Sequence, residues 1–384
     1  MSVTKEISKM KDTGKIFDKD RKFLKEHISI LELSRDNAKI LISPQLQGRI
    51  MTSTDDGDHG YSYGWINYDL IKSQKFLPHC NNFGGEDRYW LGPEGGQFSI
   101  FFKTGSDFVL DDWQTPAPID TESWELVSAT QYQATLQKNM KLENYQRNVF
   151  KLNAFREIVL HDYRETGNLI DMHIPDNVSR VAFTSSNRLT NTGEDEWTRE
   201  TGMLSIWVLA QLSPSDRTTI ILPITNNDNE DLINDNYFGR IAENRIKRLS
   251  NAVLFKGDGR ERGKIGIGPK YAKPVLGSYD PLNNVLTIIK YTFNNPQQAY
   301  VNSMWEWQEE PFMGDVVNSY NDGPLPDGSI MGPFYELETS SAAANLKPGE
   351  TLRHDHTTIH LRGDYDALNR IALTVLGTDL SNCF

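Results

Sequence analysis

The 384-residue sequence contains only two cysteines, Cys80 and Cys383, and one pair is too few for a disulfide framework. It also lacks any run approaching the roughly 20 apolar residues that a membrane-spanning helix needs, so no membrane partner is expected. The opening stretch MSVTKEISKM has no apolar core of the kind that secretory signals carry. We therefore expect a cytoplasmic protein as the chain is written, and a periplasmic one if a leader was removed; the oligomeric state stays open.

Basic residues are also scarce, since 40 Lys and Arg against 52 Asp and Glu give a net charge of −12 at pH 7. Nucleic-acid binders need clustered Lys and Arg for phosphate contacts, and the only short basic stretch is Arg240–Arg248. No nucleic-acid partner is expected, and the acidic balance favours a neutral or cationic ligand. Hydrophobic residues make up 38% of the chain, enough to support a globular fold rather than disorder.

Short β-rich runs separated by Gly, Pro, Asn and Asp dominate the chain from Ala38 onward, which is typical of a sandwich or barrel. Strands are predicted at Lys39–Ser43, Phe98–Lys103, Glu125–Ala129, Phe155–Tyr163, Met203–Ala210, Thr218–Pro223 and Val285–Tyr291. Helix signals lie near the two ends, at Asp18–His27 and Asp366–Gly377. Because no linker divides the chain, we expect a lead-in over residues 1–30 and a single all-β domain over residues 31–384.

Three segments combine aromatic, charged and glycine residues without a regular period, and these are Asn81–Gln97, Tyr300–Pro324 and Met331–His356. Sugar C–H faces stack on aromatic rings, while sugar hydroxyls need paired donors and acceptors. This composition therefore predicts a carbohydrate site, with a mono- or oligosaccharide as the partner. The candidate binding residues are Arg88, Glu94, Trp113, Trp305, Asn318 and Glu336.

The third segment contains ETSSAAANLKPGE, Glu338–Glu350, after a β-like FYEL. This pattern resembles the C-terminal signature of aldose 1-epimerases, in which a Glu-Thr pair precedes a short loop and a Pro-Gly-Glu turn. Nearly the whole chain resembles an uncharacterised bacterial family of the galactose-mutarotase-like superfamily, through GRIMTSTDDGDHGYSYGWINYDLI, FGGEDRYWLGPEGGQFSIFF, DDWQTPAPIDTE, NSMWE and GDVVNSYNDGP. The resemblance implies a large antiparallel β-sandwich, the galactose-mutarotase-like supersandwich, with short N-terminal and C-terminal helices.

The same resemblance implies roles for two residues. In aldose 1-epimerases the Glu of the Glu-Thr pair is the general base on the anomeric hydroxyl, and Glu338 occupies that position here. An Arg in a glycine-rich early segment holds sugar hydroxyls, and Arg88 is its counterpart. The epimerase His that protonates the ring oxygen has no counterpart, because residues 174–353 contain no His. His79 is one candidate for the missing acid.

The run ELET places Glu336 and Glu338 on the same face of a predicted strand. Two adjacent carboxylates favour a raised pKa or a bound cation, and they also resemble the acid/base pair of a glycosidase. Three functions therefore stay open: mutarotase-like proton transfer, glycoside hydrolysis or elimination, and non-catalytic sugar binding in glycan utilisation. The missing His favours the last of these more than the resemblance suggests.

No cofactor is expected, although two places offer donors for a divalent metal. A strand at Arg353–Leu361 would carry His354, His356 and His360 on one face, as zinc ligands, as hydrogen-bonded residues, or with one of them as an acid near Glu338. The run Gly314–Gly323 offers oxygen ligands for calcium without the spacing of an EF-hand. These ligands are Asp315, Asn318, Asn321 and Asp322.

Three further interpretations concern local structure. Arg88 and Glu94 could form an internal ion pair in their glycine-rich loop instead of meeting a ligand. In MWEW, Trp305 and Trp307 are predicted on one strand face, as core residues or as a sugar platform. The stretch Lys256–Gly268 lacks the ending of a phosphate-binding loop and predicts a β-hairpin.

Overall fold

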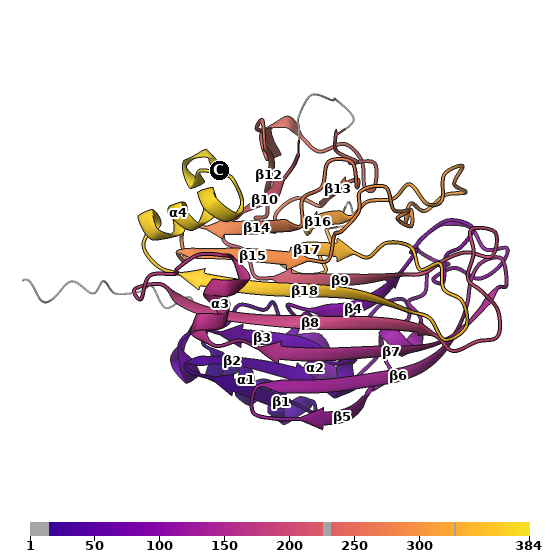
Figure 1. Cartoon of the computed structure of the whole chain (residues 1–384), viewed down its shortest axis with the longest axis horizontal. Helices are drawn as coiled ribbons and strands as arrows, with labels where there is room; N and C mark the ends of the chain where they lie inside the picture. Colours follow the sequence, from indigo (N-terminus) through magenta and orange to yellow (C-terminus); the bar gives the residue numbers. More distant parts are fainter. Residues whose placement is uncertain (1–14, 226–231, 326–327) are drawn as a thin grey trace, which may run out of the picture.

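The computed structural model describes residues 15–225, 232–325 and 328–384, and antiparallel sheets dominate it (Figure 1). The front sheet has ten strands, in the order β11 (Ile246–Arg248), β12 (Ala252–Lys256), β10 (Thr219–Pro223), β14 (Val275–Asp280), β15 (Val285–Tyr291), β18 (Thr351–Arg362), β8 (Ser179–Asn191), β7 (Val149–Leu160), β6 (Gln133–Glu143) and β5 (Glu125–Ala129). A five-stranded sheet has the order β13 (Gly263–Ile267), β16 (Val317–Asn321), β17 (Tyr335–Ser340), β9 (Ser205–Leu212) and β4 (Arg88–Gly92).

A three-stranded sheet of β1 (Leu31–Arg35), β2 (Ala38–Ser43) and β3 (Arg49–Thr54) extends the five-stranded one. The two are joined where Ile50 of β3 pairs with Asp87, just before β4. The α-helices are α1 (Phe17–His27), α2 (Tyr68–Ser73), α3 (Tyr163–Leu169) and α4 (Tyr365–Val375). Short 3₁₀ helices are η1 (Pro44–Leu46), η2 (Gly57–His59), η3 (Ala117–Ile119), η5 (Glu243–Arg245) and η6 (Leu380–Asn382).

Side chains alternate between the two faces of each strand, and the inward-facing apolar ones form the core between the ten-stranded and five-stranded sheets. In β7, Leu152 and Ile158 point inward from the ten-stranded sheet and are fully or almost fully buried. They belong to the same apolar cluster as Ile206 and Val208 of β9, from the opposing layer. Burying one such side chain contributes about 1.5–3 kcal/mol, so this alternation fixes which face of each sheet is internal.

The two predicted end helices are confirmed. Asp364 caps α4, because its carboxylate accepts a hydrogen bond from the Ala367 N–H at 2.9 Å. Leu368 and Ile371 of α4 pack against apolar residues of β14, β15 and β18, and Figure 1 shows the helix beside the ends of these strands. Among the described residues, no helix is long and apolar enough to cross a membrane.

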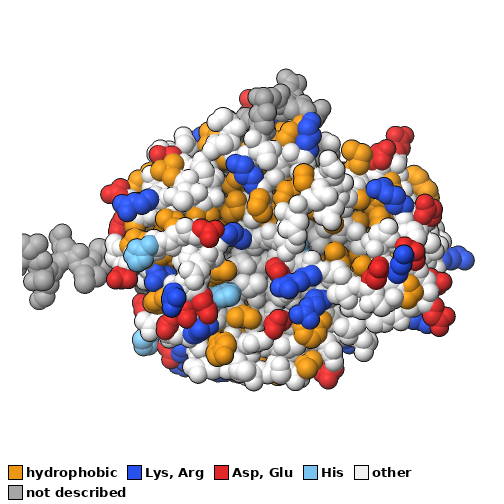
Figure 2. All heavy atoms as spheres, in the orientation of Figure 1, with side chains coloured by type: hydrophobic (Ala, Val, Ile, Leu, Met, Phe, Trp, Pro, Cys, Tyr) orange, Lys and Arg blue, Asp and Glu red, His pale blue; other side chains and the backbone are white. Residues whose placement is uncertain are grey.

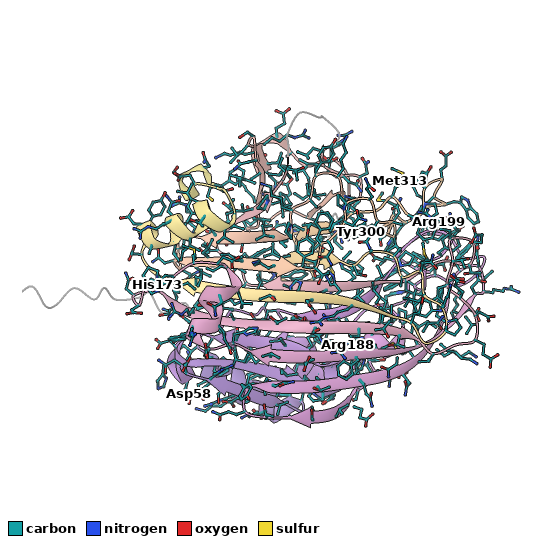
Figure 3. The ribbon with its side chains drawn as sticks, in the orientation of Figure 1. Asp58, His173, Arg188, Arg199, Tyr300 and Met313 are labelled. Carbon is teal, nitrogen blue, oxygen red and sulfur yellow. The ribbon has the colours of Figure 1, made fainter. Side chains whose placement is uncertain are left out.

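The outer face of the ten-stranded sheet carries charges of both signs. Figure 2 shows Lys, Arg, Asp and Glu side chains interspersed on this side of the molecule. Arg188 of β8, labelled in Figure 3, lies in the middle of the sheet with its guanidinium 4.8 Å from the centre of the Phe155 ring. No single sign of charge is concentrated on the side that Figure 2 displays.

Three local predictions are wrong, and in each the tertiary structure overrides the local pattern. Phe98–Lys103 forms no strand: its apolar residues are buried along an irregular path. Lys256–Gly268 is not a hairpin, because β12 belongs to the ten-stranded sheet and β13 to the five-stranded one. MWEW is not a strand either, since the Glu306 N–H bonds back to the Met304 carbonyl; Trp305 is partly buried and Trp307 is 64% exposed.

His354, His356 and His360 share one face of β18, as predicted, and that face points into the core. The rings of His354 and His356 each lie 2.9 Å from the Thr339 hydroxyl, through Nε2 and Nδ1 respectively. His360 Nε2 lies 2.7 Å from a carboxylate oxygen of Glu86. Thr339 follows Glu338 in β17, so these histidines approach the face of the strand opposite to that of Glu338. They are hydrogen-bonded core residues, and none is placed to act as an acid beside Glu338.

Buried histidines make stability depend on pH, and we expect the stability that His354 and His356 contribute to be lost on acidification below about pH 6.5. Burial lowers the pKa of His354 to about 3 and that of His356 to about 4. Between pH 6.5 and these values the unfolded chain binds protons that the folded chain does not. The histidine contribution to the free energy of unfolding therefore decreases as the pH is lowered. The loss is on the order of 3 kcal/mol per histidine.

Urea unfolding at pH 7, 5.5 and 4 would measure this slope. Carboxylates titrate over part of the same range, so His356→Gln is the matched comparison. Its pH dependence should be flatter than that of the wild type, whatever its stability at pH 7. Equal slopes in both proteins would rule out the histidine contribution.

Candidate functional site

Two rows of side chains in register cross the outer face of the five-stranded sheet. The first row consists of Arg88, Leu209, Glu338 and Asn318. The second row consists of Gln211, Glu336, Tyr320 and Lys264. Because strand side chains alternate between faces, residues two apart in each strand point the same way, and the pairing register brings them into one array.

A cavity of about 160 Å³ opens over this array. Its aromatic lining consists of Trp90, Trp113, Trp207, Phe238, Trp305, Tyr320 and Phe334. Its polar and charged lining consists of Asn82, Arg88, Glu94, Gln211, Arg262, Lys264 and Glu336. Rings with a few convergent polar groups are the usual make-up of a small-molecule site, and we call this cavity the cleft.

Glu336 is the carboxylate of β17 that lines the cleft. Its Oε1 accepts a hydrogen bond from Gln211 Nε2 at 2.8 Å and lies 3.4 Å from Arg88 Nη2. Burial raises the pKa of Glu336 to about 7, and the nearby charge of Glu338 adds to the rise. Near neutral pH this group therefore exists in both protonation states.

Glu338 lies in the same sheet face but does not line the cleft. It is fully buried, and its Oε2 accepts hydrogen bonds from Lys264 Nζ and from the Trp207 indole N–H, both at 2.9 Å. Its Oε1 is buried without a hydrogen-bond donor in the part of the chain that the structure describes. The Lys264 ammonium also lies 4.8 Å from the centre of the Trp207 ring and 5.3 Å from that of Tyr237. Glu338 thus holds the buried Lys264 cation, which itself lines the cleft.

Glu94 reaches the cleft from the loop that follows β4. Its backbone N–H donates to the Ser303 hydroxyl at 3.2 Å, which ties the loop to the segment carrying Trp305. Burial raises the pKa of the Glu94 carboxyl to about 7, although Lys264 and a hydrogen bond from Trp305 oppose the rise. The cleft therefore contains a second carboxyl group that can change protonation near neutral pH.

Five of the predicted binding residues meet at the cleft: Arg88, Glu94, Trp113, Trp305 and Glu336. Arg88 pairs with Glu336 and not with Glu94, and its guanidinium lies 4.2 Å from the centre of the Trp90 ring. Trp113 and Trp305 stack with their centres 5.7 Å apart. Gly84 of the early loop approaches protein backbone, since a Cβ on it would lie 2.1 Å from the Trp65 carbonyl oxygen.

Two predicted residues lie beside the cleft. His79 is partly buried and bonds through Nδ1 to the Trp113 carbonyl at 2.6 Å, and it is not among the lining residues. Asn318 borders an adjoining small space with Lys264, and donates to the Tyr237 hydroxyl at 3.1 Å. No histidine occurs among the cleft-lining residues of the described chain.

The proposed calcium ligands do not converge. Asp315 precedes β16 and accepts hydrogen bonds from Asn234 and Tyr237, whereas Asp322 follows the strand and accepts from Tyr320 and the Gly332 N–H. Burial raises the pKa of both carboxyls. Within the described ranges, no group of three or more His, Cys, Asp or Glu is placed to hold a metal ion.

Lys264, Trp207, Gln211 and Arg262 are lining residues that the sequence did not single out. Lys264 does carry a signal, because it is one charge in the otherwise apolar strand GKIGI. Gln211 likewise is a polar residue in the mostly apolar strand SIWVLAQL, but nothing in the sequence distinguishes Trp207 from a core residue of that strand. Only the pairing of β9 with β17 and β4 places them on the cleft face.

Comparisons with known proteins agree with this architecture. The model of a family of unknown function, DUF6786, matches residues 15–383. Among curated proteins none matches the sequence. A putative aldose 1-epimerase from Escherichia coli K12 has a similar structure, with a TM-score of 0.53 and 12% identity over 88% of this chain and 99% of that one.

Two further solved structures are similar over almost the same span. The Slr1438 protein from Synechocystis sp. PCC 6803 gives a TM-score of 0.52 at 12% identity, over 88% of this chain and 96% of that one. A galactose mutarotase-like protein from Lactobacillus casei ATCC 334 gives 0.51 at 8% identity, over 87% and 100%. At such identities the likeness shows the fold alone, and the predicted galactose-mutarotase-like β fold is confirmed.

Proposed function

The chain belongs to the DUF6786 family, and from its cleft we propose that it binds an aldose and transfers protons at the anomeric carbon. One observation carries the proposal: two glutamates, Glu336 and Glu94, line one aromatic cleft, where burial raises the pKa of each carboxyl to about 7. The fold supports it, because two proteins of similar structure are named as a putative aldose 1-epimerase and a galactose mutarotase-like protein.

The chemistry requires one base and one acid. The ionised carboxylate of one glutamate removes the proton from the anomeric hydroxyl, and the C1–O5 bond breaks as the carbonyl forms at C1. The protonated carboxyl of the other gives its proton to the ring oxygen. Rotation about C1–C2 and the reverse transfers close the ring on the other face. We assign the base to Glu336 and the acid to Glu94, since a pKa near 7 suits both tasks at neutral pH.

The remaining cleft residues fix the reacting groups. Gln211 and Arg88 both approach Glu336 Oε1, which orients the carboxylate and leaves Oε2 for a sugar hydroxyl. Lys264 supplies a fixed positive charge that lowers the cost of a developing negative charge on oxygen. Glu338, the residue chosen by the resemblance, acts in this proposal as a positioning residue that holds Lys264.

A second candidate function is sugar binding without turnover. It is favoured by the absence of histidine from the described lining and by the ion pair that occupies one oxygen of Glu338. Saturation-transfer NMR and polarimetry on freshly dissolved aldoses separate the candidates. Binding with faster anomer interconversion supports the enzyme, binding at the uncatalysed rate supports the binding module, and release of sugar from glycosides would indicate a hydrolase.

Trp305 offers a test of the cleft itself. We expect Trp305→Ala to weaken sugar binding by about 10-fold, because an aromatic contact contributes about 0.5–1.5 kcal/mol beyond the area it buries. Trp307→Ala is the matched control, since this ring is 64% exposed and outside the lining. Titration calorimetry with the sugar identified by NMR measures both. If the two variants weaken binding equally, the sugar does not bind in the cleft.

A further inference from the structure

Three cations line the cleft, and two of them have anionic partners. Arg88 pairs with Glu336 at 3.4 Å and Lys264 with Glu338 at 2.9 Å. Arg262 makes no ion pair with a carboxylate in the described part of the chain. Its Nε is buried and has no acceptor among the same residues. A buried guanidinium N–H without a partner is destabilising, and a bound acceptor would satisfy it.

The residues around Arg262 orient its side chain toward the cleft. The pairing of β13 with β16 places Gly263 opposite Asn321, so Arg262 lies beside Asp322 at the end of the ladder. The Arg262 charge acts on Asp322, since it opposes the rise in the pKa of that carboxyl, but the hydrogen bonds that Asp322 accepts come from the Tyr320 hydroxyl at 2.7 Å and the Gly332 N–H at 2.9 Å. The guanidinium instead lies 3.9 Å from the centre of the Phe238 ring, another lining residue.

A stacked guanidinium is a specific receptor for planar or tetrahedral anions. Its N–H groups form a fork that matches two oxygens of a carboxylate or phosphate, and the ring beneath holds the fork in one orientation. Arg262 precedes Lys264 by two residues on the same side of the chain, so the two Cα atoms lie about 7 Å apart. An anionic group that binds to Arg262 would thus belong to the same sugar that contacts Lys264 and Glu336.

We propose that the cleft selects sugars bearing an anionic group, a carboxylate as in a uronic acid or a phosphate ester, and that Arg262 binds this group. The inference rests on the proposed function, since it specifies the sugars that the same cleft accepts. The net charge of −12 favours neutral or cationic ligands for the protein as a whole. The local balance differs, because Arg262 brings a positive charge to the cleft with no ion-pairing carboxylate among the described residues.

Titration calorimetry with galactose, galacturonate and galactose 6-phosphate, and with the corresponding gluco sugars, tests the proposal. We expect wild-type protein to bind an anionic sugar at least about 10-fold more tightly than its neutral parent. Arg262→Gln should lower that affinity by about 10- to 100-fold and leave the affinity for the neutral sugar within about two-fold. Arg262→Lys, which keeps the charge without the fork, should fall between.

Arg260→Gln is the control, because Arg260 is 63% exposed, pairs with Asp216 and lies outside the lining. It should bind every sugar as the wild type does. A preference for galacturonate that Arg262→Gln abolishes assigns the site to carboxylates, and the same result with the phosphate ester assigns it to phosphates. Equal affinity for neutral and anionic sugars overturns the anion site and leaves the proposed function intact. Binding of none of these sugars overturns the proposed function itself.

Discussion

Glu336→Gln is expected to lower the catalysed rate of anomer interconversion by about 100- to 10,000-fold, the usual contribution of a positioned acid or base. Glutamine matches glutamate in size and keeps an oxygen to accept the 2.8 Å hydrogen bond from Gln211. It cannot take up a proton, so folding and sugar binding should persist while proton transfer stops. Polarimetry at saturating sugar gives the rate, and saturation-transfer NMR gives the binding.

The pH dependence adds a second readout. Glu336 must be ionised to act as the base and Glu94 protonated to act as the acid, and both have a pKa of about 7. The wild-type rate should therefore be highest near pH 7, falling below it as Glu336 is protonated and above it as Glu94 is ionised. A rate that rises steadily with pH would contradict this pairing.

Glu310→Gln, which changes an exposed carboxylate, is the control and should retain full activity. Glu338→Gln is measured alongside Glu336→Gln, because the resemblance to aldose 1-epimerases implies that Glu338 is the base. If Glu338→Gln is folded and inactive while Glu336→Gln is active, the catalytic role returns to Glu338.

Lys264→Met should destabilise the fold by about 3–5 kcal/mol, because it leaves the Glu338 carboxylate buried without a counter-charge. Glu338 is fully buried and the Lys264 side chain is 10% exposed, so solvent screens their 2.9 Å contact weakly. Methionine fills most of the same space, which separates the lost charge from a lost volume. Urea unfolding at pH 7 measures the change in the free energy of unfolding.

The double variant Lys264→Met with Glu338→Gln removes both charges and should recover much of this loss. Lys138→Met is the control for an exposed pair, since Lys138 meets Glu122 at 2.7 Å where Glu122 is 46% exposed. It should cost no more than about 1 kcal/mol. Strictly additive effects at Lys264 and Glu338 would show that their contact contributes nothing to stability.

Several features of the fold were predictable because they depend on near neighbours in the chain. Val285–Tyr291 and Glu125–Ala129 are strands with the predicted bounds, and the apolar spacing and Asp cap of α4 predicted a helix. Strand alternation likewise placed Glu336 and Glu338 on one face. In each case the period of the side chains follows from local backbone geometry.

The site needed more than local geometry. Alternation predicted that His354, His356 and His360 share a face but did not say which, and only the packing of β18 in the ten-stranded sheet turns them into the core. The failure at Phe98–Lys103 has the same origin, because burial in an irregular loop and burial in a strand select the same apolar residues.

From the sequence it was possible to predict a β-rich chain with helical ends, aromatic and acidic loops suited to a sugar, and a pair of carboxylates on one strand. Only the tertiary structure shows that Arg88 meets Glu336 across 248 positions, that Lys264 is the partner of Glu338, and that the Arg262 Nε has no acceptor among the described residues. These contacts arise from strand pairing between distant segments. The burial of whole layers fixes that pairing, and no local pattern encodes it.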